Sequence, residues 1–254
     1  MSKRRFGNYG WIPDIPDARD RLLSLPRKAG ALPPSADLRA GCPAIYDQGQ
    51  IGSCTANAIA GAIEFDQRKQ QLPQPFTPSR LFIYYNERVM ENSVASDSGA
   101  QIRDGIKSVG SQGACGETLW PYVEDQFAVR PSPPCYKIAR THPAVSYSRV
   151  PQDLNQLKAC LAAGYPFVLG ITVYESFESD AVASSGIVPM PGNSETSLGG
   201  HAVMAAGYDD ASSRFLVRNS WGTDWGMGGY FTIPYAYLTD DNLADDFWTI
   251  RVVK

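Results

Sequence analysis

Three segments of this 254-residue chain carry residues that can act together in acyl transfer. Cys54 closes a glycine-rich stretch, YDQGQIGSC over residues 46–54, and opens a stretch whose apolar residues have helical spacing. His201 begins the apolar stretch HAV, and Asn219 begins NSWGTDWG. A thiol becomes a nucleophile when it ionises, and the partial positive charge at a helix N-terminus favours the thiolate. Cys54 is therefore the candidate nucleophile.

The chain has two histidines, and His201 is the better candidate for the base beside Cys54. His142 lies in a proline-rich stretch that would hold its ring poorly, whereas His201 stands between glycines and an apolar run. Asn219 can orient the second ring nitrogen with a neutral amide that does not trap the proton. The backbone N–H of Cys54 and the side-chain amide of Gln48 can donate to a developing oxyanion.

The composition excludes several other classes of protein. The net charge is −3, from 23 basic and 26 acidic residues, which argues against nucleic acid as the main partner. No apolar run of about 18 residues predicts a membrane span. The cysteines form no CxxC pair and no glycine-rich phosphate-binding motif occurs, so we expect no metal and no cofactor. The N-terminus lacks the apolar core of a secretory signal, so we expect a cytoplasmic protein, or one exported by a non-standard or trimmed signal.

Apolar periodicity predicts helices in the first part of the chain and strands in the last part. The expected helices cover residues 54–69, 77–90, 100–110 and 152–163, with Ser53 as the N-cap of the first and Pro78 in the first turn of the second. The expected strands cover residues 167–174, 201–209, 214–220, 228–234 and 246–253. Residues 126–145 contain four prolines and are predicted to be a connection.

This order of elements predicts an α+β protein with two packed halves. We expect an N-terminal extension over residues 1–31, a mainly helical domain over 32–130 that carries the nucleophile, and a mainly β domain over 131–254 that carries the histidine and the asparagine. The C-terminal strand can cross back to the helical half.

The candidate residues stand in an order that resembles the papain family of cysteine peptidases. The matching motifs are Gln48-Gly49 followed by Gly52-Ser53-Cys54, then Trp120-Pro121-Tyr122, His201-Ala202-Val203 and Asn219-Ser220-Trp221-Gly222-Thr223-Asp224-Trp225-Gly226. The resemblance covers about residues 32–253. The Gly-Ser-Cys-Thr-Ala-Asn version of the nucleophile segment and the GWIPDIPDARD lead resemble bacterial members.

The resemblance implies a papain-like fold in which a helical domain and an antiparallel β-barrel-like domain flank an active-site cleft. It further implies that Cys54 attacks the scissile carbonyl as a thiolate paired with His201, which then protonates the leaving amine. Asn219 would orient His201, Trp221 would shield that contact from water, and Gln48 would complete the oxyanion hole. We therefore expect an endopeptidase that acts on peptides or proteins as a monomer.

Some residues depart from the family pattern. Thr55 replaces the usual aromatic residue after the nucleophile, and Ile51 replaces a usual cysteine. Cys135 alone stands near a family cysteine position, so the family's disulfide framework is absent, although Cys42 and Cys115 can still pair. Cys160 lies among helical apolar residues and is expected to be buried and inert.

Substrate contacts follow more loosely from the resemblance. Ser98 and Gly99 match the segment that binds the peptide backbone. The pocket for the second residue before the cut would have walls of small residues and an acidic floor, formed by Gly170, Gly200, Ala202 and Asp245. An acidic floor favours arginine or lysine beside leucine or phenylalanine.

The extension is too short for the family's usual inhibitory lead segment, which is near 100 residues long. Pro13 and Pro16 favour extended backbone, and the apolar Trp11 and Ile12 are expected to dock. We hypothesise that residues 5–25 run along the body and that Trp11 partly blocks the cleft. The basic start, at residues 3–5, is expected to be a solvated tail.

Two alternatives remain open at this point. A papain-like fold without catalysis could bind peptides or a partner, but it would lack some of the four catalytic residue types, all of which are present. The same thiol could instead catalyse peptide ligation or deamidation, because the acyl-enzyme is common to these reactions and only the acceptor differs.

Overall fold

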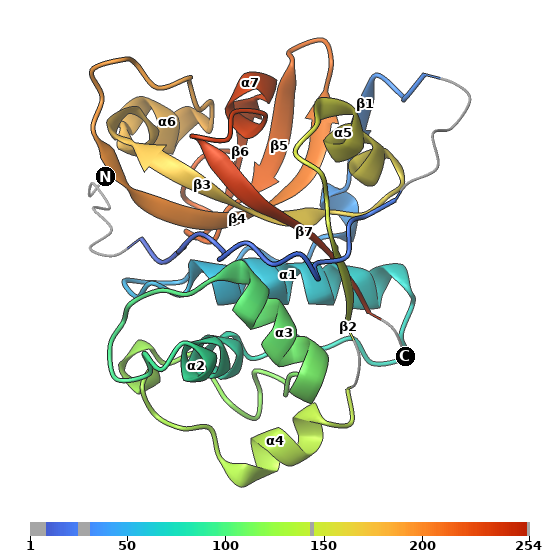
Figure 1. The fold of residues 1–254 in the computed structure, drawn as a ribbon, viewed down its shortest axis with the longest axis vertical. Coiled ribbons are helices and arrows are strands. Elements are labelled where there is room, and N and C mark those ends of the chain that lie inside the picture. The colour runs from blue at the N-terminus through green and yellow to red at the C-terminus, as the bar shows by residue number, and fades with distance from the viewer. Residues whose placement is uncertain (1–8, 25–30, 143–144, 253–254) are drawn as a thin grey trace.

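The computed structural model describes residues 9–24, 31–142 and 145–252, and it has a helical layer below a curved antiparallel sheet (Figure 1). The predicted α+β class is confirmed. The helical layer contains α1 (Cys54–Lys69), α2 (Arg80–Met90), α3 (Ile102–Gln112) and α4 (Pro133–Ala139). Short helices α5 (Leu154–Ala162), α6 (Asp180–Ser185) and α7 (Tyr235–Leu238) surround the sheet.

The sheet has the strand order β2-β7-β3-β4-β5-β6, with β1 paired to β4, and all these pairs are antiparallel. The strands are β1 (Ser35–Asp37), β2 (Val145–Arg149), β3 (Phe167–Tyr174), β4 (Ser197–Asp209), β5 (Arg214–Arg218), β6 (Tyr230–Pro234) and β7 (Ala244–Val252). Among the described residues the first and last strands of this order do not pair, so the expected barrel-like sheet is open and is not a closed barrel.

Helix α1 forms the side of the helical layer that faces the sheet and is buried from Cys54 to Gln67. Its alanine-rich sequence has high helix propensity and small side chains, which let the sheet and the other helices approach closely. One apolar core joins α1 to α2, α3 and one face of the sheet, and a second core covers the opposite face. Side chains alternate between the two cores along β4, as Met204 and Ala205 illustrate.

Three local predictions need correction. Ser53 stands at the N-cap position of α1 as predicted, but its hydroxyl bonds Tyr122 and makes no side-chain cap hydrogen bond to the helix. Helix α2 begins at Arg80, since Ser79 caps it by accepting the N–H of Phe82, and Pro78 lies before the helix in a bridge to Gly116. The proline-rich connection contains α4, because prolines are tolerated in the first turn of a helix, where no intrahelical partner is needed.

Strand β7 extends past α1 and pairs with β2 beside the helical layer, so the C-terminal strand contacts both the helices and the rest of the sheet (Figure 1). Strand β1 precedes the helical segment in the chain and joins the sheet by pairing with β4. Among the described residues, no helix has the length and apolar character needed to cross a bilayer.

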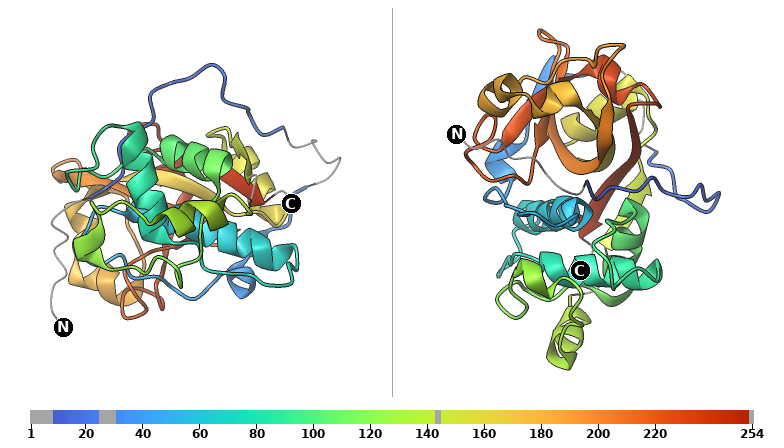
Figure 2. Two further views of the ribbon diagram at one scale, coloured as in Figure 1. Left: turned by 90° about the horizontal axis from the view of Figure 1, so that it is seen from below. Right: turned by 90° about the vertical axis from the view of Figure 1, so that its left-hand side faces the viewer.

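Residues 9–24, called the strap below, run extended between the helical layer and the sheet. Trp11 forms a parallel bridge with Ala100, and Leu22 forms one with Arg149. The strap then stands out from the body around its middle (Figure 2), where Ile15 is exposed. The basic residues 3–5 lie outside the described part of the chain.

Candidate active site

Cys54 is the first residue of α1 and is completely buried against β4. Its Sγ accepts the backbone N–H of Ala202 at 3.3 Å. Because Ala202 directly follows His201 on β4, the strand brings the histidine to the N-terminal end of α1. Residues 148 positions apart in the chain are thus in direct contact.

The His201 ring is fixed on two sides. Its Nε2 lies 2.8 Å from Oδ1 of Asn219, and Trp221 stacks on the ring with centroids 4.8 Å apart. The same Asn219 oxygen accepts the backbone N–H of Ser220, and the backbone N–H of Asn219 donates to Gly229. The asparagine side chain is therefore held in one orientation while it holds the ring.

Gln48 is tied to the segment that follows Asn219. Its Oε1 accepts the Ser220 hydroxyl at 2.6 Å, and its backbone N–H donates to the Ser220 carbonyl. These bonds identify the side-chain oxygen as the acceptor and leave Nε2 as the donor. One Nε2 hydrogen bonds the carbonyl of Ile51 at 3.1 Å, and the second remains available for a ligand.

The side chains of Cys54 and His201 are in a dry environment. Burial raises the pKa of Cys54 to about 12, although the backbone N–H groups of Ala202 and Gly10 oppose the shift. Burial lowers the pKa of His201 to about 4, against the opposing hydrogen bond to Asn219. Desolvation disfavours both charged forms, so near neutral pH this arrangement contains a thiol and a neutral imidazole.

The strap is the cover that keeps water out. Tyr9 packs edge-on against the His201 ring, and its hydroxyl bonds Glu178. Gly10 lies so close to Gly52 that an added Cβ would overlap the Gly52 carbonyl. The Gly10 carbonyl accepts the N–H of Ala100 at 2.8 Å, which fixes the strap across the nucleophile.

Trp11 occupies the region predicted to be a substrate pocket. Its indole packs on Gly170 and Gly200, where any Cβ would overlap the ring. Its backbone N–H donates to the Gly200 carbonyl at 2.9 Å. Ile12 donates its backbone N–H to Ala100, while its side chain is 38% exposed.

The other predicted binding residues lie at different distances from this region. Gly99 packs against Gly10, and Ser98 precedes it. Ala202 contacts the nucleophile through its backbone, and Trp221 covers the histidine. Asp245 does not meet Trp11, because its side chain is 49% exposed and lies 3.5 Å from Arg149.

The acidic group beside Trp11 is Asp246, which the sequence analysis missed. Its side chain is fully buried, and its Oδ2 accepts the indole N–H of Trp11 at 3.0 Å. Neighbouring residues of a strand point to opposite faces, so an error of one position exchanges an exposed group for a buried one. The pairing of β3 with β7 shifts register between Asp245 and Trp248, which includes this residue, and Asp246 has φ = 59°.

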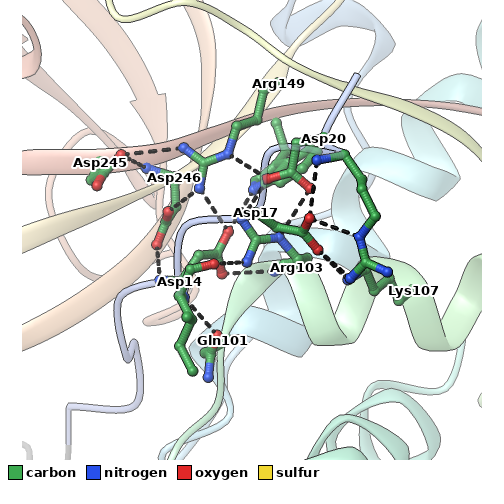
Figure 3. Close-up of polar contacts among 12 residues, drawn as sticks. Asp14, Asp17, Asp20, Gln101, Arg103, Lys107, Arg149, Asp245 and Asp246 are labelled. Atoms are coloured by element: carbon green, nitrogen blue, oxygen red, sulfur yellow. Dashed lines mark hydrogen bonds and ion pairs between the residues drawn. The ribbon is translucent and has the colours of Figure 1, made fainter. Parts of the chain in front are cut away.

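Asp246 is part of a cluster of three carboxylates and two arginines that anchors the strap (Figure 3). We call this the anchor cluster; its members are Asp14, Asp20, Arg103, Arg149 and Asp246. Arg149 Nη2 donates to Asp14 at 3.1 Å and to Asp246 at 2.7 Å. The Asp14 carboxylate also accepts hydrogen bonds from the backbone N–H of Arg103 and the indole N–H of Trp248. Two strap carboxylates are thus fixed by cations of the body.

Within the described ranges, no group of three or more His, Cys, Asp or Glu side chains could hold a metal ion. The five cysteines are free, and Cys42 and Cys115 lie in different clusters, so this pairing is not formed. Cys160 is buried, with its thiol on the Tyr165 carbonyl.

The sequence pattern of papain family cysteine proteases matches residues 32–243. The chain therefore belongs to the papain family and is a cysteine protease that acts on peptides or proteins. It is similar to xylellain, a cysteine protease from Xylella fastidiosa, with 46% identity, 100% of this chain and 99% of that chain covered, and a TM-score of 0.91.

Two curated relatives support the same family. An uncharacterized peptidase C1-like protein of Acanthamoeba polyphaga mimivirus is 42% identical over 97% of this chain and 87% of its own length. Chicken cathepsin K is 30% identical over 73% of this chain, which spans 53% of that relative. Procathepsin L 3 of Tenebrio molitor, at 20% identity and a TM-score of 0.70, shares the fold.

Proposed function

We propose that Cys54, His201, Asn219 and Gln48 catalyse peptide-bond hydrolysis in this chain. The observation that carries the assignment is the 2.8 Å contact of His201 with Asn219, on the strand whose next residue binds Cys54 Sγ. The Cys54 thiolate attacks the scissile carbonyl, and the imidazolium of His201 gives its proton to the leaving amine. Water then attacks the acyl-enzyme with His201 as base.

Two donors are available for the oxyanion. The free hydrogen of Gln48 Nε2 is one, and the backbone N–H of Cys54 at the start of α1 is the other. Asn219 orients the imidazole through its oxygen, which the Ser220 N–H also holds. Trp221 covers this contact and keeps competing water away.

We further propose that the strap holds the enzyme inactive. Tyr9, Gly10 and Trp11 occupy the space over the catalytic pair, which leaves Cys54 and His201 with almost no exposed surface. The cover acts sterically, and it also acts through desolvation, because the reactive ion pair needs solvation that the closed site does not supply.

The geometry of the strap supports the proposal that it covers the site without being cleaved. The backbone N–H of Gly10 bonds the Cys54 thiol. In a trans peptide the carbonyl points opposite to the N–H, so the Tyr9 carbonyl is directed away from the nucleophile. The next carbonyl, that of Gly10, is engaged by Ala100 instead of the oxyanion donors.

The pocket that Trp11 fills is proposed to bind a substrate side chain once the strap has left. Gly170 and Gly200 make it wide, and the buried Asp246 carboxylate lies at the far end of the indole. We expect it to accept large aromatic side chains and long basic ones, because both can place a nitrogen donor on Asp246.

The test compares the full chain with a form lacking residues 1–31, a deletion that removes the strap and keeps β1 intact. Hydrolysis of fluorogenic peptides and alkylation of Cys54 by iodoacetamide are measured together. We expect both rates to rise after truncation, and Cys54→Ala to abolish hydrolysis in either form. Equal rates in the two forms would refute inhibition by the strap, whereas hydrolysis by the Cys54→Ala variant would refute the catalytic assignment.

A further inference from the structure

Two of the five cysteines lie together in an apolar cluster separate from the one that contains the nucleophile. Cys115 and Cys135 are both completely buried and pack with Phe82 and Ala139 in one small apolar cluster. Their side chains are within hydrogen-bonding reach of each other. All five cysteines are in the described part of the chain, and the other three, Cys42, Cys54 and Cys160, belong to different clusters.

The segment between these two cysteines supports the loop that precedes the nucleophile. The Tyr122 hydroxyl donates to the Gln48 carbonyl at 2.8 Å and lies 2.6 Å from the Ser53 hydroxyl. Glu124 accepts the backbone N–H of Gln50 at 2.7 Å. A bond between Cys115 and Cys135 would therefore close the base of a loop whose tip holds the oxyanion donor Gln48 in place.

We propose that Cys115 and Cys135 form a disulfide that fixes this loop, by exchange with a small-molecule disulfide such as glutathione disulfide. One cysteine thiolate attacks the oxidant's S–S bond, forms a mixed disulfide and releases one thiol. The second cysteine thiolate then attacks the protein sulfur of the mixed disulfide and releases the second thiol. The two cysteines lose two electrons and two protons, and the oxidant disulfide gains them as two thiols.

Burial sets when this bond can form. It raises the pKa of Cys115 well above that of a free thiol, and the neighbouring Cys135 raises it further. The thiolate is therefore scarce in the closed fold, and the exchange runs fastest during folding or when α4 opens from Phe82. The bond would stabilise the loop in an oxidising environment. It would form more slowly than a disulfide between exposed cysteines.

The experiment uses the full chain with Cys54→Ser, which keeps the oxidant off the nucleophile and leaves four of the five cysteines. The protein is incubated with glutathione disulfide, once in native buffer and once in urea below the unfolding transition, then alkylated and mapped by mass spectrometry. We expect two thiols to be lost and a Cys115–Cys135 peptide to appear. The melting temperature should rise by roughly 6–12 °C after oxidation.

Matched variants separate this pair from the others. Cys115→Ser and Cys135→Ser should each prevent the loss of two thiols and the rise in melting temperature, whereas Cys42→Ser and Cys160→Ser should retain both. Survival of all four thiols in both buffers would overturn the proposal. So would a cross-linked peptide that joins any other pair.

Discussion

The indole N–H of Trp11 donates to Oδ2 of Asp246 at 3.0 Å and so joins residues 235 positions apart in the chain. The same carboxylate oxygen accepts the backbone N–H of Asp14 at 2.7 Å. One buried aspartate of β7 thus binds both a side chain and the backbone of the strap. The proposed closed state depends on this contact, and its consequences can be measured.

Trp11→Ala should activate the full-length enzyme. The closed state would lose the buried indole, worth about 3–5 kcal/mol, while the open state would lose little. We expect peptide hydrolysis by the full chain to rise at least tenfold, up to the rate of the form without residues 1–31. Ile12→Ala is the control, because the backbone N–H that bonds Ala100 is retained and the side chain is 38% exposed, and it should change the rate far less than Trp11→Ala. An inactive Trp11→Ala enzyme whose truncated form is active would contradict the placement of the indole.

Gly10→Ala should also release the strap, for a steric reason. A methyl group at this position overlaps the Gly52 carbonyl, and backbone on both sides leaves no flexible side chain to move aside. Gly192→Ala offers a matched control, because its added Cβ meets the Glu195 side chain at ordinary contact distance. Iodoacetamide labelling of Cys54 measures exposure directly: it should accelerate in the first variant and remain slow in the second.

The strap should open more readily as the pH rises. Burial, followed by repulsion from Asp14, raises the pKa of Asp246 to about 7 in the closed state. Once hydrated, this carboxyl should return to about 3.9. Because the pKa of Asp246 is higher in the closed state than in the open state, protonation of Asp246 stabilises the closed state. This contribution is complete below about pH 4 and is lost as the pH rises through about 7. The other charged groups around Asp14 and Asp246 are two carboxylates and two guanidinium groups, those of Asp20, Asp245, Arg103 and Arg149.

The catalytic pair does not obscure this effect between about pH 5 and 8. In the closed state the one proton of this pair is on the Cys54 thiol, and in the open ion pair it is on His201. Opening therefore changes neither the total number of protons on the two residues nor the pH dependence of opening in this range. The ratio of full-length to truncated activity should therefore increase from pH 5 to pH 8, by at most about tenfold per unit. Asp246→Asn should flatten this ratio. Strongest activation of the full chain at acid pH would reverse the assigned sign.

Gln48→Ala should lower kcat in the truncated enzyme. Loss of one oxyanion donor costs about 10²–10³-fold in kcat, with a smaller effect on KM, because the charge develops in the transition state. Gln50→Ala is the control of the same residue type, since Gln50 is exposed and uses only its backbone N–H. Steady-state kinetics on one peptide compare the two variants. A Gln48→Ala enzyme with unchanged kcat would remove Gln48 from the mechanism.

Local sequence predicted the elements that carry the site with useful accuracy. The alanine-rich stretch from Cys54 predicted α1 to its observed bounds, because helix propensity and apolar spacing are properties of neighbouring residues. Helix α4 was missed, because prolines that usually mark a connection here stand in a first helical turn. The acidic group beside Trp11 was placed one residue too early, because strand register depends on the partner strand.

Residue type and order alone indicated the family through its motifs and predicted a thiol, an imidazole and two amides as the catalytic groups, because these groups limit the reactions that a site can perform. Only the tertiary structure decided that Trp11 lies on Gly170 and Gly200, and that Asp246 holds it. These contacts join segments about 160–235 positions apart, and no pattern of neighbouring residues encodes such pairings. The proximity of Cys115 to Cys135 was decided in the same way, because only the packing around Phe82 places these two cysteines in one cluster.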